Sequence, residues 1–589
     1  GETLRNMVPM VSWESTKGQG FLAKDTGLDN YAFASTGTLS LEYPLFGSGD
    51  MREPAFHALY EDGSRITCLE YSGHKIIDGK PALEGLPATY SDGDKVETLE
   101  LYLKDKLTGL EICLYYSVFE EKNAIARSVR AVNRGEKKIK LLRADSASVD
   151  FYDCDMELVH LHGLWGRERH IERVKTPVGI QRYDSKRGAS SHAANPFIAL
   201  AEPCANEICG NVYAMSLVYS GSWEGIAEKD PFNSLRLNMG INSFDFCWAL
   251  NPGESLQLPE AILVHSSHGF GEMSRIYHRL YRDNLIRGKF KRSPRPVLVN
   301  NWEATYFNFT EEKLLEIAES AKNIGIDLLV LDDGWFGKRN DAKSSLGDWV
   351  TNAEKLPDGL RGLGEKITAK GLQFGIWMEP EMVSPDSDLY RKHPDWCIHV
   401  NGRNRSLTRC QLILDLSRRE VCDYIIEAVT NVLKSAPVSY VKWDMNRNIS
   451  ESGSAGLAPE NQGELHYRYI LGLYSVLETL TSRFPDVLFE GCSGGGGRFD
   501  AGMLYYFPQI WCSDDTDAIE RLYIQYGTSM VYPVNSMGSH VSACPNHQLG
   551  RVTPFSLRGN VAMSGQFGYE LDLSKLDENE TETAKCQVE

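Results

Sequence analysis

A change of pattern after Pro296 constrains the fold of this chain more than any other feature of its sequence. From that point, short apolar runs rich in β-branched residues alternate with amphipathic segments of helical period, which is typical of a parallel sheet covered by helices. The runs are Val297–Trp302, Glu311–Ile324, Asp327–Trp335, Leu360–Lys370, Gln373–Pro380, Glu420–Ser435, Tyr440–Asp444, Leu465–Phe484, Val487–Cys492 and Gln509–Asp514. Because polar residues end the strand-like runs, we predict a (β/α)8 TIM-type barrel with its active site at the carboxyl ends of the strands. Leu412–Leu416 fits either a strand or a loop, so the strand count stays open.

The first half of the chain has the pattern of antiparallel strands instead. Thr98–Leu103 and Leu110–Phe119 alternate apolar with polar residues, and turn signals such as Asn133–Gly135 separate runs of this kind. We predict a multidomain protein, with an N-terminal antiparallel β-sandwich at residues 1–265 and a helical, basic linker at residues 266–296. The catalytic barrel is then expected at residues 297–589.

Charge and cysteine content narrow the classes of partner. The chain has 80 acidic and 62 basic residues, a net charge of −18, so its surface repels phosphate backbones and we expect no nucleic-acid partner. No apolar stretch is long enough to span a membrane, and residues 1–20 lack the pattern of a secretory signal. The 13 scattered cysteines form no close Cys-x-x-Cys pairs. We therefore expect reduced thiols in a cytoplasmic protein.

The ends of the strand-like runs collect many carboxylates together with tryptophans. These ends are Asn300–Glu303, Asp332–Trp335, Trp377–Glu381, Lys442–Arg447, Glu490–Arg498 and Trp511–Asp517. Carboxylates accept hydrogen bonds from hydroxyls, aromatic faces stack on sugar rings, and a carboxylate pair supplies the acid and the nucleophile for glycoside cleavage. For a single aspartate, capping of the following helix is about as good an explanation. Six such ends together favour a sugar-processing site.

Two of these aspartates have surroundings suited to catalysis. Lys442, Asp444 and Asn446 alternate along one run, so they face the same side of a strand. A positive neighbour keeps Asp444 ionised, as a nucleophile requires. Asp514 follows Trp511, and an apolar wall of that kind raises the pKa of a carboxylic acid towards the range of a general acid.

Other readings of the same residues are weaker. Leu329–Asp333 resembles the magnesium-binding strand of nucleotide hydrolases, but no phosphate-binding loop accompanies it. A metal site from Asp332, Glu379 and Glu381 is less favoured than a sugar site because no histidine lies at these strand ends. We predict no metal and no cofactor. Cys492 has no nearby histidine to activate it, so we expect it to pack or to touch a ligand.

The motifs, taken in order, resemble those of the α-galactosidases of glycoside hydrolase family 36, and the resemblance covers essentially the whole chain. The matching strings in the second half are NNWE (300–303), LDDGWF (331–336), FGIWMEPEMV (374–383), VKWDMNR (441–447), CSGGGGRFD (492–500) and SDDTDAIERL (513–522). Three strings match in the first half: EYPLFGSGDMREPA (42–55), GLWGRE (163–168) and RGASSHAAN (187–195).

This resemblance implies a retaining α-galactosidase that hydrolyses terminal α-D-galactosyl residues of melibiose, raffinose and stachyose. Asp444 matches the catalytic nucleophile of the family, and Asp514 matches its general acid/base. Asp332 and Asp333 match the pair that binds the 4- and 6-hydroxyls of galactose. The other substrate-binding positions implied are Trp302, Trp377, Arg409, Lys442, Asn446, Cys492, Gly495 and Trp511.

The resemblance also implies an oligomer. Asp50 resembles a loop residue that, in bacterial tetramers of the family, reaches the active site of a neighbouring subunit, so we expect a homo-oligomer, a tetramer by this resemblance. The C-terminal β-sandwich of the family is expected to be absent, because only Asp577–Glu589 follows Leu571–Leu576. The alternatives are an α-N-acetylgalactosaminidase or a galactosyl transferase of the same family, or a truncated carbohydrate-binding relative without activity.

Overall fold

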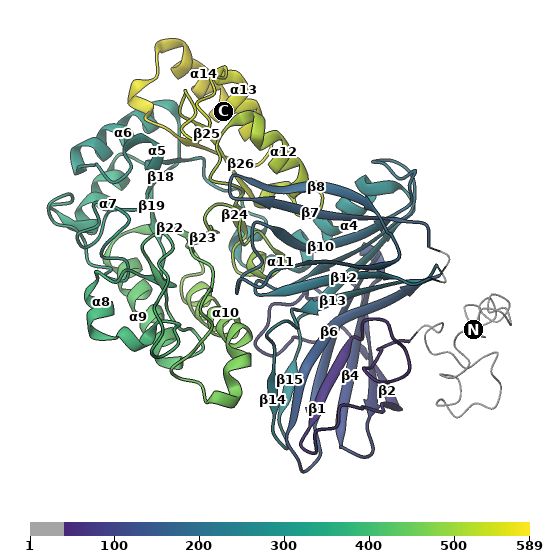
Figure 1. Ribbon diagram of the computed structural model, residues 1–589. Coiled ribbons are helices and arrows are strands. Elements are labelled where there is room, and N and C mark those ends of the chain that lie inside the picture. The colour runs from purple at the N-terminus through teal and green to yellow at the C-terminus, as the bar shows by residue number, and fades with distance from the viewer. Residues whose placement is uncertain (1–40, 153, 232) are drawn as a thin grey trace, which may run out of the picture.

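The computed structural model describes residues 41–152, 154–231 and 233–589, so residues 1–20, considered above for a secretory signal, lie outside the described part. Figure 1 shows two parts, an N-terminal region of long strands and a C-terminal barrel surrounded by helices. This arrangement confirms the predicted fold class. No helix in the described part of the chain has the length and apolar character needed to cross a membrane.

The N-terminal region consists of two antiparallel sheets. The larger, ten-stranded sheet has the order β2–β3–β4–β5–β16–β11–β10–β7–β8, with β15 beside β5. Its strands are β2 (Glu70–Asp78), β3 (Val96–Lys104), β4 (Leu110–Phe119), β5 (Ala124–Asn133), β7 (Glu157–Leu164), β8 (Arg167–Lys175), β10 (Ala194–Ala201), β11 (Val212–Leu217), β15 (Ser255–Gln257) and β16 (Ala261–Ser266). The two runs that alternate in the sequence became β3 and β4, and β4 has the predicted bounds.

The smaller, six-stranded sheet has the order β1–β6–β13–β12–β9, with β14 beside β6. Its strands are β1 (Phe56–Tyr60), β6 (Ile139–Phe151), β9 (Gly179–Asp184), β12 (Trp223–Lys229), β13 (Leu235–Ile241) and β14 (Trp248–Leu250). Every residue of β10 and of β13 is buried, whereas the edge strand β2 is mostly exposed and carries charged residues. The core of this region therefore lies between the central strands of the two sheets.

The C-terminal part is a closed barrel of eight parallel strands. They are β17 (Leu298–Asn300), β18 (Leu328–Leu331), β19 (Gln373–Met378), β22 (Val438–Trp443), β23 (Leu488–Gly491), β24 (Gln509–Trp511), β25 (Met537–Ser542) and β26 (Gln566–Glu570). The sequence predicted the first six. It missed β25 and β26 because MGSHVS and QFGYE lack a β-branched apolar run. Leu412–Ile413 forms β21, which pairs with β20 (Met382–Val383) outside the barrel.

Helices surround the barrel. They are α5 (Trp302–Thr305), α6 (Glu311–Ile324), α7 (Gly359–Ala369), α8 (Asp388–Lys392), α9 (Arg419–Ser435), α10 (Leu465–Arg483), α11 (Ala501–Leu504), α12 (Ala518–Ser529), α13 (Phe555–Ala562) and α14 (Glu578–Val588). The bounds of α6 match the prediction because both ends carry strong signals. The Thr310 side chain accepts a hydrogen bond from the Lys313 backbone N–H, and Gly325 ends the helix with φ of 97°.

The connection between the two parts is packed against them. The predicted helix forms as α4 (Gly269–Asn284), whose inner face buries Met273, Leu280 and Tyr281, among others. The basic run that follows contains Lys291, which is buried and pairs with Asp92. The segment therefore fixes the barrel against the N-terminal sheets rather than tethering it loosely.

Hydrogen bonds between the two parts set how they are oriented. Asp500 caps α11 of the barrel, and its carboxylate accepts hydrogen bonds from Ser190 Oγ at 2.6 Å and Ser220 Oγ at 2.7 Å. Both serines belong to the N-terminal region. Since Asp500 is fully buried, this contact fixes the sheets against the loop that follows β23.

Candidate active site

A cavity of about 280 Å³ opens at the carboxyl ends of the barrel strands. Ten of the thirteen predicted site residues line it: Trp302, Asp332, Asp333, Trp377, Arg409, Lys442, Asp444, Asn446, Trp511 and Asp514. Strand ends separated by more than 200 residues therefore meet in one pocket, as a parallel barrel requires.

Asp444 follows β22 and is surrounded by hydrogen-bond donors. Its Oδ1 accepts from the backbone N–H groups of Met445 at 2.8 Å and Gly494 at 3.2 Å. Its Oδ2 accepts from Asn446 Nδ2 at 2.6 Å and Trp377 Nε1 at 3.2 Å. Four donors hold both oxygens in place, which orients the carboxylate for attack.

The charges around Asp444 favour its ionised form. Burial works to raise its pKa, but the positive charges of Lys442 and Arg409, together with the hydrogen bond from Asn446, outweigh burial and lower it. Lys442 is itself buried and donates to Asp332 Oδ2 at 3.1 Å. Asp444 is therefore an anion near neutral pH, as the sequence reasoning expected.

Asp514, beyond the end of β24, has the opposite character. Burial raises its pKa, and the negative charge of Asp444 raises it further. Two indole N–H groups flank the carboxyl group: Trp511 Nε1 lies 3.2 Å from Oδ1, and Trp165 Nε1 lies 3.0 Å from Oδ2. A carboxyl group in such a setting is suited to hold a proton and to release it to a bound oxygen.

Trp165 reaches the pocket from the N-terminal region, at the tip of the β7–β8 hairpin. The tip is the two-residue turn Trp165–Gly166, and Gly166 has φ of 78°, which glycine adopts without strain. Arg169, just after the turn, is buried in the barrel loops, where it donates to the Gly496 carbonyl at 2.8 Å and to Thr528 Oγ1 at 2.7 Å. This anchor holds the hairpin tip against the barrel, so the position of Trp165 is fixed.

Asp332 and Asp333 end β18 and are held by different partners. Asp332 Oδ2 accepts from Asn300 Nδ2 at 2.6 Å as well as from Lys442. Asp333 pairs with Arg339 through two nitrogens, at 3.0 Å from Nε to Oδ1 and 2.8 Å from Nη2 to Oδ2. Both side chains are buried and line the pocket, so a bound molecule meets two fixed acceptors on this wall.

Arg409 and Asn446 form a linked pair at another part of the wall. Arg409 Nη1 donates to Asn446 Oδ1 at 2.8 Å, which leaves the amide nitrogen of Asn446 to Asp444. Arg409 has a positive φ of 54°, a conformation rarely adopted outside glycine. Behind them Glu379 accepts from the Asn446 backbone at 2.6 Å, and burial raises the pKa of Glu379 to about 7.

Cys492 and Gly495 lie behind Asp444 and Asp514 rather than on the cavity surface. Burial raises the pKa of the Cys492 thiol, which donates to Asp444 and helps to lower the pKa of that carboxyl. Gly495 has φ of 82°, and a Cβ there would lie 2.7 Å from the Asp514 backbone nitrogen and 2.8 Å from Glu168. Glycine is therefore required where the loop passes close to the acid.

Asp50 does not belong to this pocket. Its carboxylate is buried in the N-terminal region, where it accepts from Arg52 at 2.8 Å and from Arg236 at 2.8 Å. Within one chain the carboxylate of Asp50 therefore has partners in the N-terminal region. That Asp50 contributes to the active site of a neighbouring subunit stays a prediction.

Four residues line the pocket that the sequence reasoning did not select: Trp165, Glu303, Gln548 and Glu570. Trp165 lay within a motif already singled out, GLWGRE, but nothing in its pattern placed it beside the barrel. Glu570 ends the unpredicted strand β26 and accepts from His540, which lies within β25, at 3.1 Å. Burial and the charge of Glu570 raise the pKa of Glu303 to about 8.

The arrangement can cleave a bond that needs an acid and a nucleophile together. One carboxyl has its pKa lowered by cations and the other has its pKa raised by burial, and both line one cavity. When the pKa values of two neighbouring carboxyl groups are shifted in opposite directions, the group with the raised pKa is suited to act as the acid and the other as the nucleophile. Fixed acceptors and four indole rings around them suit a ring that carries hydroxyl groups.

Comparisons with known proteins agree with this geometry. Residues 7–251 match the glycosyl hydrolase family 36 N-terminal domain, and residues 255–589 match the melibiase family. α-Galactosidase AgaA of Geobacillus stearothermophilus is 58% identical over 555 residues, which cover 94% of this chain and 76% of that protein. α-Galactosidase Mel36A of Lactobacillus acidophilus is 47% identical over 94% of this chain and 76% of its own length.

Solved structures give the same result. The crystal structure of the Geobacillus enzyme superimposes with a TM-score of 0.93 at 57% identity, covering 95% of this chain and 78% of that one. A variant of that enzyme in complex with raffinose gives a TM-score of 0.94 at 56% identity, covering 95% of this chain and 78% of that one. Another variant was solved in complex with stachyose, with a TM-score of 0.93 at 56% identity and the same coverage.

Proposed function

The chain belongs to glycoside hydrolase family 36 and is an α-galactosidase, and we propose that it removes terminal α-galactosyl residues from melibiose, raffinose and stachyose by a retaining double displacement. The observation that carries the proposal is the pair Asp444 and Asp514, which share one pocket with their pKa values shifted in opposite directions. The substrates are supported by the complexes of the Geobacillus enzyme with raffinose and stachyose.

In the first displacement the Asp514 carboxyl donates its proton to the glycosidic oxygen. A carboxylate oxygen of Asp444 attacks C1 of the galactosyl ring from the opposite face, and the bond from C1 to the protonated oxygen breaks. The leaving sugar departs as an alcohol, and the galactosyl unit stays bound to Asp444 as an ester. The four hydrogen bonds to Asp444 support this role because they hold the attacking oxygen in one direction.

In the second displacement the roles of Asp514 reverse. Its carboxylate takes a proton from a water molecule, whose oxygen attacks C1 and releases Asp444. Each step inverts the configuration at C1, so the galactose released first is the α anomer. Once the galactosyl unit neutralises Asp444, the charge that raised the pKa of Asp514 is gone, which favours the basic form needed at this stage.

Substrate recognition is assigned to the acceptors and rings of the pocket wall. Asp332 and Asp333 accept hydrogen bonds from the 4- and 6-hydroxyls of galactose, and Lys442 completes this group through its bond to Asp332. Fixed acceptors of this kind distinguish the axial 4-hydroxyl of galactose from the equatorial one of glucose. Trp302, Trp377 and Trp511 enclose the ring.

Hydrolysis of galactosides is favoured over hydrolysis of α-N-acetylgalactosaminides. The thiol of Cys492 donates to Asp444, and the backbone of Gly494 and Gly495 approaches the two catalytic carboxyls closely. This loop leaves little space beside position 2 of a sugar bonded to Asp444. An acetamido group there requires the loop to move, whereas a hydroxyl fits.

Hydrolysis of p-nitrophenyl α-galactoside, compared with the α-N-acetylgalactosaminide, tests the substrate class. We expect release from the galactoside alone, and raffinose is expected to give galactose and sucrose. NMR of the first product is expected to show α-galactose. Release of β-galactose first would contradict the double displacement. Galactosyl transfer, the remaining alternative, is tested by adding an unlabelled sugar acceptor and comparing transfer products with free galactose.

We further propose that the protein is a cytoplasmic homo-oligomer. None of the thirteen cysteines, all of which lie in the described part of the chain, forms a disulfide, which suits a reducing compartment. The exposed apolar residues Phe46 and Met51, on the loop before β1, support an association surface there. Light scattering on the purified chain is expected to give a tetramer, and a monomer at micromolar concentration would contradict the oligomer.

A further inference from the structure

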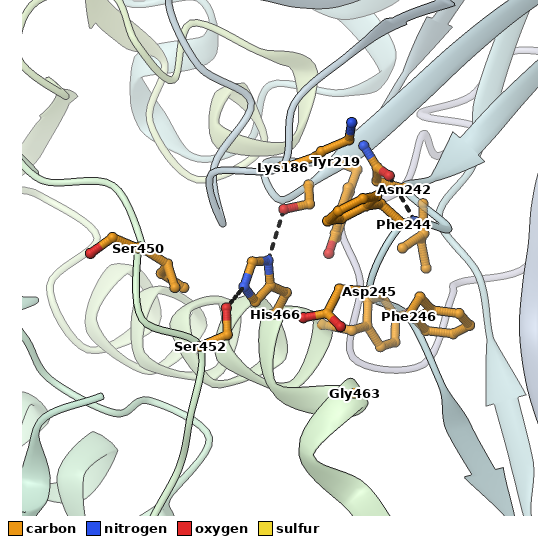
Figure 2. Close-up of a pocket in the computed structure, with 14 residues that line it drawn as sticks. Lys186, Tyr219, Asn242, Phe244, Asp245, Phe246, Ser450, Ser452, Gly463 and His466 are labelled. Carbon is orange, nitrogen blue, oxygen red and sulfur yellow. Dashed lines mark hydrogen bonds between the residues drawn. The ribbon is translucent and has the colours of Figure 1, made fainter. Parts of the chain in front are cut away.

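A second cavity, of about 320 Å³, lies between the N-terminal sheets and the barrel. It is slightly larger than the catalytic pocket of about 280 Å³ and shares no lining residue with it. Residues of the loop after β13 form one side, and residues on the segment after β22 and at the start of α10 form the other, as Figure 2 shows. A cavity of this size has room for about one sugar ring.

One side of this cavity is aromatic. Phe244 is 70% exposed, although Lys186 Nζ lies 4.5 Å from the centre of its ring. Tyr219 lies deeper, fully buried, and its hydroxyl points towards the space between Phe244 and His466 in Figure 2. Among the described residues, no group makes a hydrogen bond to the Tyr219 hydroxyl. A buried hydroxyl without a partner costs free energy, which a ligand that bonds to it recovers.

The opposite side is polar and prearranged. The ring of His466 bridges two serines: Nδ1 lies 3.0 Å from Ser222 Oγ, and Nε2 lies 2.8 Å from Ser452 Oγ. Ser222 Oγ also accepts from the Gly188 backbone. In the tautomer with the ring proton on Nε2, Ser222 donates to Nδ1 and Nε2–H donates to Ser452, so the hydroxyl proton of Ser452 is left for a molecule in the cavity. Asp245 adds an exposed acceptor at the mouth.

We propose that this cavity is a second saccharide-binding site, separate from the catalytic pocket, that holds one hexose unit of a neutral sugar. An exposed aromatic ring opposite a row of hydroxyl-bonding groups is the combination that binds a sugar ring by stacking and hydrogen bonding. An anion would face Asp245 and a cation would face Lys186, so the mixed charges favour a neutral ligand. A purely apolar molecule would leave the Tyr219 hydroxyl without a partner.

The site is connected to the catalytic pocket through a short piece of chain. Asn446 lines the pocket, and Ile449 and Ser450 line the cavity. Ser450 is four positions after Asn446, which limits the distance between their Cα atoms to about 14 Å of extended chain. Arg447, between them, donates to Ser450 Oγ at 3.0 Å and to the Ser406 carbonyl at 2.7 Å. A sugar in the cavity thus lies beside a segment that leads directly to the catalytic pocket.

Two independent spectroscopic signals, tryptophan fluorescence and ¹⁹F NMR, distinguish binding in the catalytic pocket from binding in the cavity. The catalytic pocket contains four tryptophans, whereas the cavity is lined by no tryptophan, so a change in tryptophan fluorescence that Trp377→Ala removes reports the pocket. Incorporation of 4-fluorophenylalanine gives one ¹⁹F resonance for each of the 22 phenylalanines, and the signal missing from Phe244→Leu identifies Phe244. Raffinose is titrated into the full chain carrying Asp444→Asn, so that it is not hydrolysed. Galactose is titrated into the unsubstituted chain as a second probe.

We expect the Phe244 resonance to shift in a saturable manner with both sugars. Asp245→Ala is expected to weaken binding detected at Phe244 by at least about fivefold, with no change in the fluorescence titration. Trp377→Ala is expected to weaken binding detected by fluorescence and to leave binding detected at Phe244 unchanged. Asp78→Ala, which removes an exposed aspartate on β2, is the matched control and is expected to change neither signal.

An unmoved Phe244 resonance at sugar concentrations that saturate the fluorescence change overturns the proposal. A shift that responds to Trp377→Ala but not to Asp245→Ala overturns it as well, because the signal would then report the catalytic pocket. If Phe244 responds to raffinose and the fluorescence does not, the substrate proposed above is wrong while the second site stands.

Discussion

The two sides of the catalytic pocket are built from different parts of the chain. The groups that act directly on Asp444 all come from the barrel: Lys442, Arg409, Asn446 and the loop after β23 set its charge and direction. The side around Asp514 is shared, because Trp165 from the N-terminal hairpin donates to the acid. The proposed nucleophile thus depends on cations within one domain, and the proposed acid depends on enclosure by two.

This difference teaches how two aspartates acquire opposite roles. Both side chains are buried, and burial by itself acts to raise the pKa of each. At Asp444 two cations and several donors more than offset that effect, whereas at Asp514 a second carboxylate adds to it. Substitutions that act on one side only are therefore expected to affect different steps and different limbs of the pH profile.

The largest effect is expected from removing the nucleophile. Asp444→Ala is expected to lower kcat for p-nitrophenyl α-galactoside on the order of 10⁴-fold, because no group remains to form the covalent intermediate. Azide is expected to restore part of the rate by attacking the substrate directly, which gives β-galactosyl azide. Recovery of α-galactosyl azide from this variant would contradict the assignment of Asp444.

Removing the acid is expected to cost less, and by an amount that depends on the leaving group. Asp514→Ala is expected to lower kcat/KM for raffinose by about 10²–10⁴-fold, and to affect p-nitrophenyl α-galactoside less because p-nitrophenolate leaves without a proton. Azide is expected to attack the covalent intermediate and give α-galactosyl azide. Equal losses on the two substrates would show that Asp514 is not the acid. Asp515→Asn, at the adjacent position, is the matched control.

A smaller effect is expected when the cation beside the nucleophile is neutralised. Lys442→Met is expected to lower kcat/KM at neutral pH by about 10²-fold, because Asp332 and Asp444 lose the positive charge between them. Since that charge lowers the pKa of Asp444, its loss raises the pKa, and the acid limb of the pH profile moves to higher pH. Lys442→Arg retains the charge and is expected to retain the position of that limb. If the acid limb does not move in Lys442→Met, that limb does not report the ionisation of Asp444.

The smallest effect is expected from the contribution of the N-terminal hairpin. Trp165→Phe keeps the ring but removes the N–H that stabilises the Asp514 carboxylate, so the pKa of Asp514 rises and the basic limb moves to higher pH. We expect kcat/KM near the optimum to fall about two- to tenfold. Leu164→Ala, in the same exposed tip, is the control and is expected to leave the profile unchanged. If Trp165→Phe moved the acid limb instead, the surroundings of Asp444 and Asp514 would not be independent of each other.

Much of the barrel followed from local pattern. The bounds of α6 were predicted to the residue because Thr310 and Gly325 mark its ends chemically. β25 and β26 were missed because Met537–Ser542 and Gln566–Glu570 carry glycine and polar residues where a buried strand usually has apolar ones. Those two strands form only because neighbours on both sides supply their hydrogen bonds, which no local pattern records.

Some residues of the candidate site were predicted from the sequence and others were not, for the same reason. Asp444 and Asp514 stand at the ends of predicted strands, so their place on the rim followed from the period of the pattern. Trp165 and Glu570 were not selected, the first because it comes from another domain and the second because its strand was not recognised. Asp50 was selected by resemblance to a residue that acts between subunits, and within one chain it is buried and paired with Arg52 and Arg236.

The sequence by itself determined that a β region precedes a barrel, and that a row of carboxylates and tryptophans lies on one rim. Periodicity and the residue types at strand ends are local properties, so they can be read from the sequence without knowledge of tertiary contacts. Lys442 and Trp511, which lie beside the two aspartates in the sequence, already indicated which carboxyl favours the anion and which the protonated form. Only the tertiary structure added Arg409 and Trp165, which reach the same pocket from distant positions and act on the pKa values of Asp444 and Asp514. A charge state depends on all three-dimensional neighbours and on burial, and most of these cannot be read along a single strand.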